Sequence, residues 1–398
     1  MDDGRVLVVG AGPVGLVAAT FLARAGVPVT IVEASAELPE DLRASTFHPP
    51  TLDMLDRLDV SDKLKAQGLV CPYWQFRDRR EGAIATFDLG MLAGETRHPY
   101  RLQCEQWKLT RLLRAELEAR GDVEFLYNVH AQDVTQDENS VSLTVTEPDG
   151  AVRTLTGRYL IGADGARSAV RKSLGTVFTG MTIPEIFLSL STRHRFEVKL
   201  PDLENIAYIS DPDEWLVLLR TPSLWRVLLP SDPNEPEESM RAPDRIEARL
   251  QSVQANPAGY EVVHSTAYRV HERVAEQYVT GRAFLIGDAA HLNNPLGGMG
   301  MNGGIHDAVN LAEKLIEVWH GAPLATMGRF ERQRRKVAVE TVQAQALRNR
   351  QILNERDPAA RRAYHDELRG IAADPEKHRA YVRRSSMIQS LRDLEQVA

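Results

Sequence analysis

The sequence predicts an α/β fold with a parallel sheet, a second sheet of mainly antiparallel strands and a helical C-terminal region. Three observations predict it. Apolar runs at residues 5–9, 158–162 and 283–287 each lead into a glycine-containing turn and a helical pattern. Residues 180–275 alternate apolar and polar side chains instead. Charged residues in helical spacing dominate from residue 329 to the end.

The composition is that of an ordinary globular protein. The 398 residues are 43% hydrophobic and 26% charged, which suits two or three domains and excludes a disordered or fibrous chain. A net charge of −7 argues against nucleic acid or an anionic membrane as the main partner. Cys71 and Cys104 are too few for a disulfide framework, so we expect a reducing, cytoplasmic compartment.

Residues 6–23 carry no charge and have nearly the length of a membrane span. However, Asp2 and Asp3 stand where a signal peptide would have cations, and Gly10, Gly12 and Gly15 interrupt the stretch. We therefore expect neither a membrane span nor a signal peptide, and the glycines require another explanation.

The first 35 residues match a βαβ unit with a dinucleotide-binding turn. The strand RVLVV is followed by GAGPVG, a helical segment and a second strand, PVTIVE. Gly10 permits the turn, Gly12 lets a pyrophosphate approach the backbone, and Gly15 allows close helix–strand packing. Glu33 ends the second strand, where a carboxylate can accept bonds from ribose hydroxyls. A purely structural glycine turn is the alternative, but the complete order favours a dinucleotide site.

Two later motifs repeat the arrangement of strand, glycine turn and helix. In RYLIGADGARSAVR, Asp164 either lies beside a ligand or caps the following helix, and the sequence leaves both interpretations open. In GRAFLIGDAAHLNNPLGGMGMNGGIHDAVNL, a strand ends near Asp288 and five glycines fall within residues 297–304. This is more glycine than a turn requires, and the N-terminus of the helix that follows could stabilise a negative charge on a ligand.

Taken together, GAGPVG with Glu33, GADGARS and GDAAHxxxPxGGxGxN resemble the class A flavoprotein monooxygenases, the para-hydroxybenzoate hydroxylase group. The motifs cover about four-fifths of the chain. The resemblance implies a Rossmann-type FAD-binding domain with an inserted mixed or antiparallel-sheet substrate domain and a C-terminal helical tail. We expect the FAD-binding domain at 1–70, 100–178 and 272–325, the substrate domain at 71–99 and 179–271, and the helical region at 326–398.

The resemblance also assigns cofactor contacts. The FAD-binding positions it implies are Gly10, Gly12, Pro13, Gly15, Glu33, Arg43, Gln106, Asp164, Asp288, Pro295, Gly298, Gly300, Met301 and Asn302. Gln103 is close enough to Gln106 that the register between them stays open. The chain departs from the family pattern at Asn294, where many members have proline, and at Thr110, where glutamate is usual.

The activity implied by the resemblance is hydroxylation of a small aromatic compound of the phenol, hydroxybenzoate, aminobenzoate or pyridine type. In this family NADH or NADPH reduces FAD, and oxygen then forms a flavin C4a-hydroperoxide, which a closed and apolar pocket protects from water. Family members often dimerise, so a homodimer is an expectation. Alternatives are another FAD-dependent oxygenation (epoxidation, N-hydroxylation or Baeyer–Villiger insertion), a non-catalytic flavin-binding redox sensor, and a flavin-free dehydrogenase.

The candidate catalytic residues are His48, Tyr268 and Pro295. Aromatic side chains that could contact substrate are Tyr73, Trp74, Tyr208, Trp215 and Trp225, although large aromatics often serve only the core. His264 and His271 are further acid–base candidates, whereas His291 is expected to shape the glycine-rich loop. No metal-ligand spacing and no GxSxG nucleophile motif occur.

The tail differs in charge from the rest of the chain. Residues 329–398 carry a net charge of +6, which leaves −13 on the preceding residues. We expect a charged amphipathic helix whose charges pair mainly within the tail. Docking of the basic tail on the acidic body, on a second subunit or on an anionic surface is the alternative.

Overall fold

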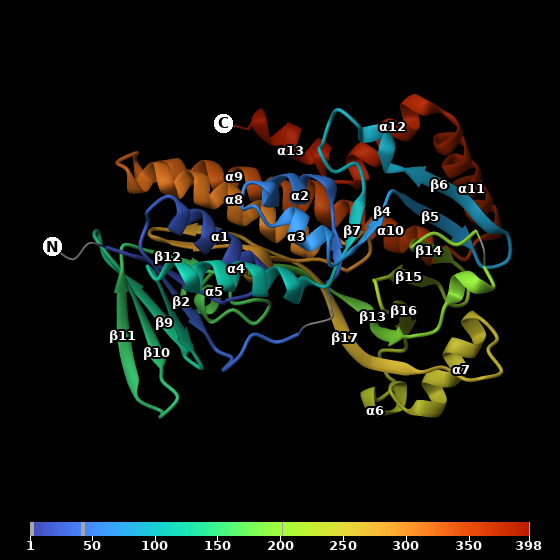
Figure 1. Ribbon diagram of the computed structural model, residues 1–398, viewed down its shortest axis with the longest axis horizontal. Helices are drawn as coiled ribbons and strands as arrows, with labels where there is room; N and C mark the ends of the chain where they lie inside the picture. Colours follow the sequence, from blue (N-terminus) through green and yellow to red (C-terminus); the bar gives the residue numbers. More distant parts are fainter. Residues whose placement is uncertain (1–3, 41–43, 201, 398) are drawn as a thin grey trace.

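A six-stranded sheet forms the core of the lobe that contains the N-terminus (Figure 1). The computed structural model describes residues 4–40, 44–200 and 202–397. Neighbouring strands of this sheet are parallel except for the pair at one edge, β18 and β19. In spatial order they are β18 (Val279–Thr280), β19 (Ala283–Leu285), β12 (Tyr159–Gly162), β1 (Val6–Val9), β2 (Val29–Glu33) and β8 (Val123–Tyr127). The apolar runs of the sequence are thus buried parallel strands, as predicted.

Helices cover one side of this sheet and a small antiparallel sheet covers the other (Figure 1). The helix α1 (Pro13–Arg24) packs against α4 (Gln106–Arg120) and α8 (Gly300–Trp319). The second layer consists of β9 (His130–Gln136), β10 (Val141–Thr146) and β11 (Val152–Gly157). Its apolar side chains at Val134, Val141 and Leu143 belong to the same core as the parallel strands.

An eight-stranded mixed sheet forms the second lobe, in the order β20-β17-β13-β16-β15-β14-β5-β6. All neighbours are antiparallel except β14 and β5, so the expected mixed sheet is confirmed. The bounds are β5 (Tyr73–Asp78), β6 (Gly82–Asp88), β13 (Phe178–Thr192), β14 (Ile206–Ser210), β15 (Leu216–Arg220), β16 (Trp225–Ser231), β17 (Val262–Ala275) and β20 (His291–Leu292). The long strands β13 and β17 join the two lobes (Figure 1).

Shorter elements connect these layers. A three-stranded sheet of β3 (Thr46–Phe47), β7 (Arg101–Gln103) and β4 (Leu69–Cys71) brings residues from both lobes together. Two short helices, α2 (Pro49–Asp56) and α3 (Ser61–Lys65), follow β3, and α5 (Ala169–Ser173) follows β12. The substrate-domain prediction includes α6 (Glu237–Met240) and α7 (Pro243–Val253), which lie between β16 and β17. The predicted domain boundaries stay a prediction.

The C-terminal region is helical, as expected, and packs against both lobes (Figure 1). Its helices are α9 (Met327–Lys336), α10 (Ala344–Leu353), α11 (Pro358–Ala373), α12 (Pro375–Ser385) and α13 (Ile388–Glu395), with a π-helical segment at Val337–Gln343 between α9 and α10. The helix α11 lies against β6, and α12 lies against β6 and the turn that follows it.

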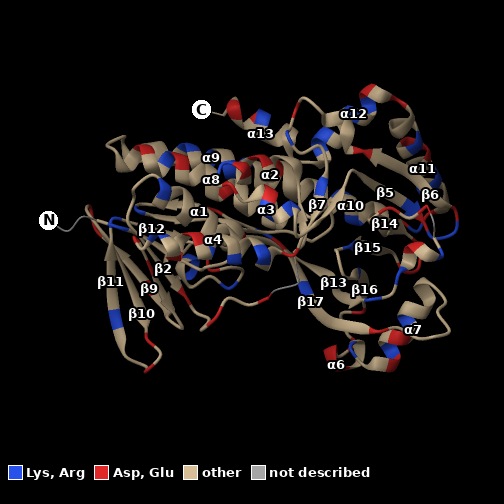
Figure 2. Ribbon diagram, in the orientation of Figure 1, with Lys and Arg blue, Asp and Glu red and all other residues tan. Residues whose placement is uncertain are grey.

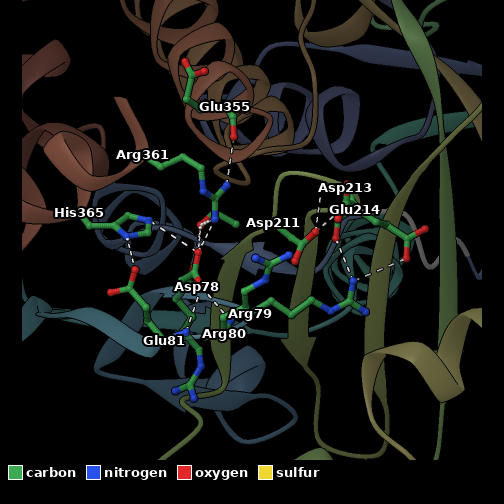
Figure 3. A network of polar contacts seen from close by, with 12 residues as sticks. Asp78, Arg79, Arg80, Glu81, Asp211, Asp213, Glu214, Glu355, Arg361 and His365 are labelled. Atoms are coloured by element: carbon green, nitrogen blue, oxygen red, sulfur yellow. Dashed lines mark hydrogen bonds and ion pairs between the residues drawn. The ribbon is translucent and has the colours of Figure 1, made fainter. Parts of the chain in front are cut away.

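Ion pairs attach this region to the body of the protein. Arg361 of α11 contacts the carboxylate of Asp78, which also accepts bonds of 2.7 and 3.0 Å from the backbone N–H groups of Arg80 and Glu81 (Figure 3). Burial would raise the pKa of Asp78, but these bonds and Arg361 lower it. Farther along, Arg379, Arg383 and Arg392 all pair with Glu95. The prediction of mainly local pairs was wrong, because the acidic body supplies the counter-ions.

Basic and acidic residues are interspersed over both lobes in the view of Figure 2. Among the described residues, none of the helices is both long enough and apolar enough to cross a membrane.

Candidate functional site

A cavity of about 510 Å³ opens where the carboxyl ends of β1, β2 and β12 meet, and it extends to the face of the eight-stranded sheet. Crevices at the carboxyl ends of parallel strands are the usual ligand sites of such sheets. The predicted site residues that line it are Gly12, Pro13, Glu33, Gln106, Tyr208, Tyr268, Asp288, Pro295, Gly298, Gly300 and Met301. Segments far apart in the sequence therefore share one space.

The glycine turn shapes one end of the cavity. Gly10 has a φ of +103°, and a Cβ there would lie 2.4 Å from the carbonyl oxygen of Ala163. A Cβ on Gly15 would lie 2.0 Å from the oxygen of Gly10, so side chains are excluded at both positions. A Cβ on Gly12, by contrast, would meet no atom within 4 Å, because this glycine faces the open cavity.

The start of α1 has the features of an anion site. Its N-cap residue, Gly12, has no side chain that could cap the helix, and Pro13 has no N–H to be satisfied. The first N–H groups of a helix lack intrahelical acceptors, so those of the first turn are available to a ligand. Open space beside Gly12 and free donors behind it fit the pyrophosphate of FAD.

Glu33 closes this end of the cavity. Its carboxylate accepts bonds of 2.8 Å from the backbone N–H groups of Ala11 and Ser35, one to each oxygen. A carboxylate has about four acceptor positions, so two remain for ribose hydroxyls. The arrangement fits the adenosine side of FAD. Arg43, the other predicted contact in this region, lies outside the described residues.

Asp164 makes the contacts of a helix cap. Its carboxylate accepts bonds from Ser168 Oγ at 2.5 Å, Ala169 N at 2.7 Å and Val170 N at 3.2 Å, at the start of α5. Its neighbours Ala163 and Gly165 line the cavity, whereas Asp164 itself is not among the described lining residues. Of the two interpretations left open by the sequence, the structure supports the cap.

The glycine-rich loop before α8 forms another wall. Pro295, Gly298, Gly300 and Met301 line the cavity, and Asp288 faces it from the turn after β19. Asn302 is fully buried beneath the loop instead, where its Nδ2 donates to the carbonyl oxygens of Thr46 at 2.8 Å and Gly298 at 2.6 Å. Asn302 therefore holds the loop to β3.

A buried cluster of three ionisable side chains, Asp307, His291 and Arg334, packs behind this loop. Asp307 accepts bonds from His291 Nε2 at 2.7 Å and Arg334 Nε at 2.6 Å, and all three side chains are at most 3% exposed. Burial would raise the pKa of Asp307, but His291 and Arg334 lower it. The expectation that His291 shapes the loop agrees with these contacts.

His48 is also buried behind the loop and does not reach the cavity. Its Nε2 lies 2.9 Å from the carbonyl oxygen of Gly297, and its backbone N–H donates to Asn302 Oδ1 at 2.9 Å. Burial lowers the pKa of His48 well below its ordinary value, so the imidazole is neutral at pH 7. These contacts fit a structural histidine better than the predicted catalytic role. Tyr268 and Pro295, the other catalytic candidates, do line the cavity.

At its other end, the cavity reaches one face of the mixed sheet. Tyr208, Val217, Leu228 and Ser189 lie in register across four adjacent strands and all line it. Tyr268 and His271 of β17 line it as well. Burial and the neighbouring Arg273 and Arg269 lower the pKa of His271.

The remaining aromatic candidates lie elsewhere. Tyr73 is 39% exposed, and Trp215 packs against Phe187 within the core. Trp225 belongs to the opposite face of the sheet, where its Nε1 donates to Glu197 at 2.7 Å. Trp74 lines a separate, smaller cavity. None of these four is among the described residues that line the large cavity: Trp225 lies on the opposite face of the sheet, Trp215 is covered by core packing, Trp74 borders the smaller cavity and Tyr73 is exposed.

Several lining residues were not predicted. Arg226 is buried at the cavity, where its NH1 donates to Ser45 Oγ at 2.9 Å, and Trp107 follows Gln106 at the start of α4. Gln106 lines the cavity, whereas Gln103 is buried against Ser45 and Thr46. The alternation in SLWRVLLP could have identified Arg226, since it shares a face with Leu228.

Comparison with known proteins supplies independent findings. Residues 3–345 match a family model described as an FAD binding domain. A para-nitrophenol 4-monooxygenase of Pseudomonas sp. strain WBC-3 is 35% identical over 99% of this chain and 96% of its own length. The 6-hydroxy-3-succinoylpyridine 3-monooxygenase HspB of Pseudomonas putida strain S16 is 35% identical over 95% and 96%. The crystal structure of p-nitrophenol 4-monooxygenase PnpA of Pseudomonas putida DLL-E4 superposes with a TM-score of 0.92, at 32% identity over 98% of both chains.

Proposed function

The chain belongs to the family of FAD-dependent aromatic monooxygenases, and from this premise we propose that it hydroxylates a small phenol or hydroxypyridine, with NADH or NADPH as the reductant. The observation that carries the proposal is the continuity of the cavity. One space of about 510 Å³ runs from the glycine turn at Gly12 to the sheet face at Tyr208. A dinucleotide bound at the glycine turn and an aromatic ring bound at the sheet face would therefore share one space.

The residues around the glycine turn would hold FAD. The N–H groups at the start of α1 would bind its pyrophosphate, and Glu33 would bind its adenosine ribose. The glycine-rich loop at Pro295 and Gly298 would lie along its ring system, and Asp288 beside its sugar chain. When bound, FAD supplies hydride acceptance from the reductant and activation of molecular oxygen. We propose the regions 1–70, 100–178 and 272–325 as the FAD-binding part of the chain.

The start of α8 lies at the cavity, where it can stabilise negative charge on a bound ligand. Gly300 and Met301 form its first turn and line the cavity. Their N–H groups and the positive end of the helix dipole would favour an anionic, reduced ring by about 0.3–1 kcal/mol, and by more when it is buried.

The sheet end of the cavity suits an aromatic ring with a hydroxyl group. Val217, Leu219 and Leu228 form an apolar wall that excludes water from the reacting atoms. The hydroxyl groups of Tyr208 and Tyr268 are the polar groups that could orient a phenolic oxygen and share its proton. The two relatives named above act on a nitrophenol and a hydroxypyridine, which supports substrates of this class for this chain.

The test is a screen of NADH and NADPH oxidation by the purified, FAD-loaded protein with phenols, nitrophenols, hydroxybenzoates, aminobenzoates and hydroxypyridines. Oxygen uptake and product mass are recorded together. We expect one aromatic class to accelerate reductant oxidation and to give a product that contains one new oxygen atom. Hydrogen peroxide without an oxygenated product for every compound would refute the proposed activity. A protein that binds FAD but oxidises neither NADH nor NADPH would refute the proposal that one of them is the reductant.

A further inference from the structure

A second, smaller cavity lies between the mixed sheet and the C-terminal helices. Its volume is about 30 Å³, which exceeds the roughly 10–15 Å³ that one water molecule needs. Strands β5, β7 and β14 line it through Trp74, Arg101 and Tyr208, and the helices α11 and α12 contribute Tyr364 and Tyr381. Tyr208 lines both this cavity and the large one.

Arg101 brings a positive charge to this cavity without a carboxylate partner. Its side chain is only 2% exposed, and no ion pair joins it to an acidic side chain in the part of the chain that the structure describes. Its hydrogen bonds go to uncharged groups: NH2 donates to the carbonyl oxygen of Ser385 at 3.3 Å, and the guanidinium also bonds to the Tyr208 side chain. Burial lowers the pKa of Arg101, and the groups that oppose this effect are Tyr208, Tyr381 and Cys71. None of these groups is a carboxylate, and burial raises the pKa of both Cys71 and Tyr381, which keeps them neutral at pH 7.

Two buried N–H groups at this cavity have no acceptor. The Nε of Arg101 and the Nε1 of Trp74 make no hydrogen bond within the described residues, although Trp74 is only 5% exposed. The two side chains lie together, with the guanidinium carbon 5.3 Å from the centre of the indole ring. No Asp or Glu is found among the described residues that line the cavity. The lining therefore offers donors and a positive charge but no acidic acceptor.

We propose that this cavity binds one small monovalent anion of about the size of chloride, held by Arg101 and by the indole N–H of Trp74. A buried, unpaired charge is costly, by several kcal/mol, and a free N–H group adds to that cost. A water molecule could accept from the N–H groups but would leave the charge of Arg101 uncompensated. A bound anion accepts from the N–H groups and also compensates the charge of Arg101. Because Tyr208 separates the two cavities, the bound anion also supports one wall of the large cavity.

The first test compares thermal unfolding of the FAD-loaded protein in sodium chloride and in sodium gluconate of equal ionic strength. Gluconate is too large for a cavity of about 30 Å³. We expect a Tm higher by at least about 2 °C in chloride, because a ligand that binds only the folded state stabilises it. Equal Tm values in the two salts would overturn the proposal.

Substitutions of single residues test where chloride binds. Arg101→Met keeps an unbranched side chain without the charge, so it should fold in gluconate with a Tm no lower than that of the unmodified protein, and chloride should not raise it further. Trp74→Phe keeps an aromatic ring but removes the indole N–H together with part of the ring, and should weaken the chloride effect several-fold. Arg97→Met is the matched control, because the Arg97 side chain is 81% exposed and should leave the chloride effect intact. A chloride effect that survives Arg101→Met would refute the site.

Crystals soaked in sodium bromide give a readout that does not depend on stability. The anomalous signal should show a peak between Arg101 and Trp74 in the unmodified protein and none in the Arg101→Met variant. A peak in the large cavity instead would place the anion elsewhere and would overturn the proposal.

Discussion

The carboxylate of Glu33 accepts a hydrogen bond of 2.8 Å from the backbone N–H of Ala11, which ties the end of β2 to the glycine turn after β1. The same carboxylate borders the large cavity. Glu33→Ala should therefore raise the dissociation constant for FAD about tenfold or more, because a hydrogen bond to a charged group contributes about 1.5–3 kcal/mol. Quenching of flavin fluorescence during titration of the apoprotein measures this. Glu37→Ala, at an exposed position nearby, is the control, and equal affinity in the two variants would contradict the role of Glu33.

Gly12 and Gly15 should respond differently to substitution. Gly12 has an ordinary φ of −69° and open space around its Cβ direction, so Gly12→Leu should fold and yet lose most of its FAD. Gly15→Ala would place its Cβ 2.0 Å from the oxygen of Gly10 and should lower the stability of the apoprotein itself. Flavin absorbance after desalting, together with thermal unfolding of both apoproteins, separates the two outcomes. Full flavin content in Gly12→Leu would refute the pyrophosphate site.

Asp307 compensates the charge of the fully buried Arg334. Asp307→Asn keeps the size of the side chain but removes that compensation, so the free energy of unfolding should fall by about 3–5 kcal/mol. Urea denaturation measures the loss. Asp366→Asn is the control, because its side chain is 73% exposed and its substitution should change the stability by less than about 0.5 kcal/mol.

Glu272 should make stability depend on pH. Burial raises its pKa to about 7, although bonds from the backbone N–H and side chain of Asn294 oppose this. Between its ordinary pKa and 7 the folded state binds the proton more tightly, so stability falls as pH rises through this window. Glu272→Gln mimics the protonated form. At pH 8 the free energy of unfolding of this variant should exceed that of the unmodified protein by roughly 1–3 kcal/mol. The difference should shrink towards pH 4. A difference that is independent of pH would contradict the assignment.

Tyr208 and Trp225 test which face of the mixed sheet contacts substrate. Tyr208→Phe removes a hydroxyl group at the cavity and should raise KM for a phenolic substrate about tenfold. Trp225→Phe changes the opposite face and should leave KM within about twofold. Steady-state kinetics with the substrate found in the screen decide between them. An equal effect of both substitutions would show that the outcome reflects stability and not contact.

Most of the fold could be predicted because its signals are local. A buried parallel strand, a glycine turn and a helix occur within about 30 consecutive residues, and each requires particular residue types, such as the glycine at position 10 with its φ of +103°. The same holds for the antiparallel strands, whose alternation is visible in the sequence. The predicted pairing of charges within the tail was wrong because ion pairs form with whichever opposite charge is near in space. For Arg361 that charge is Asp78, almost 300 residues earlier.

The sequence by itself determined the fold class and the family, since three glycine-rich motifs in order leave few other structures for the backbone. Only the tertiary structure decided which side chains share a cavity. It brought Arg226 and Trp107 to the cavity, turned Trp225 to the opposite face, and placed His48 behind the loop. These outcomes depend on strand register and on packing between distant segments, and no single stretch of sequence carries that information.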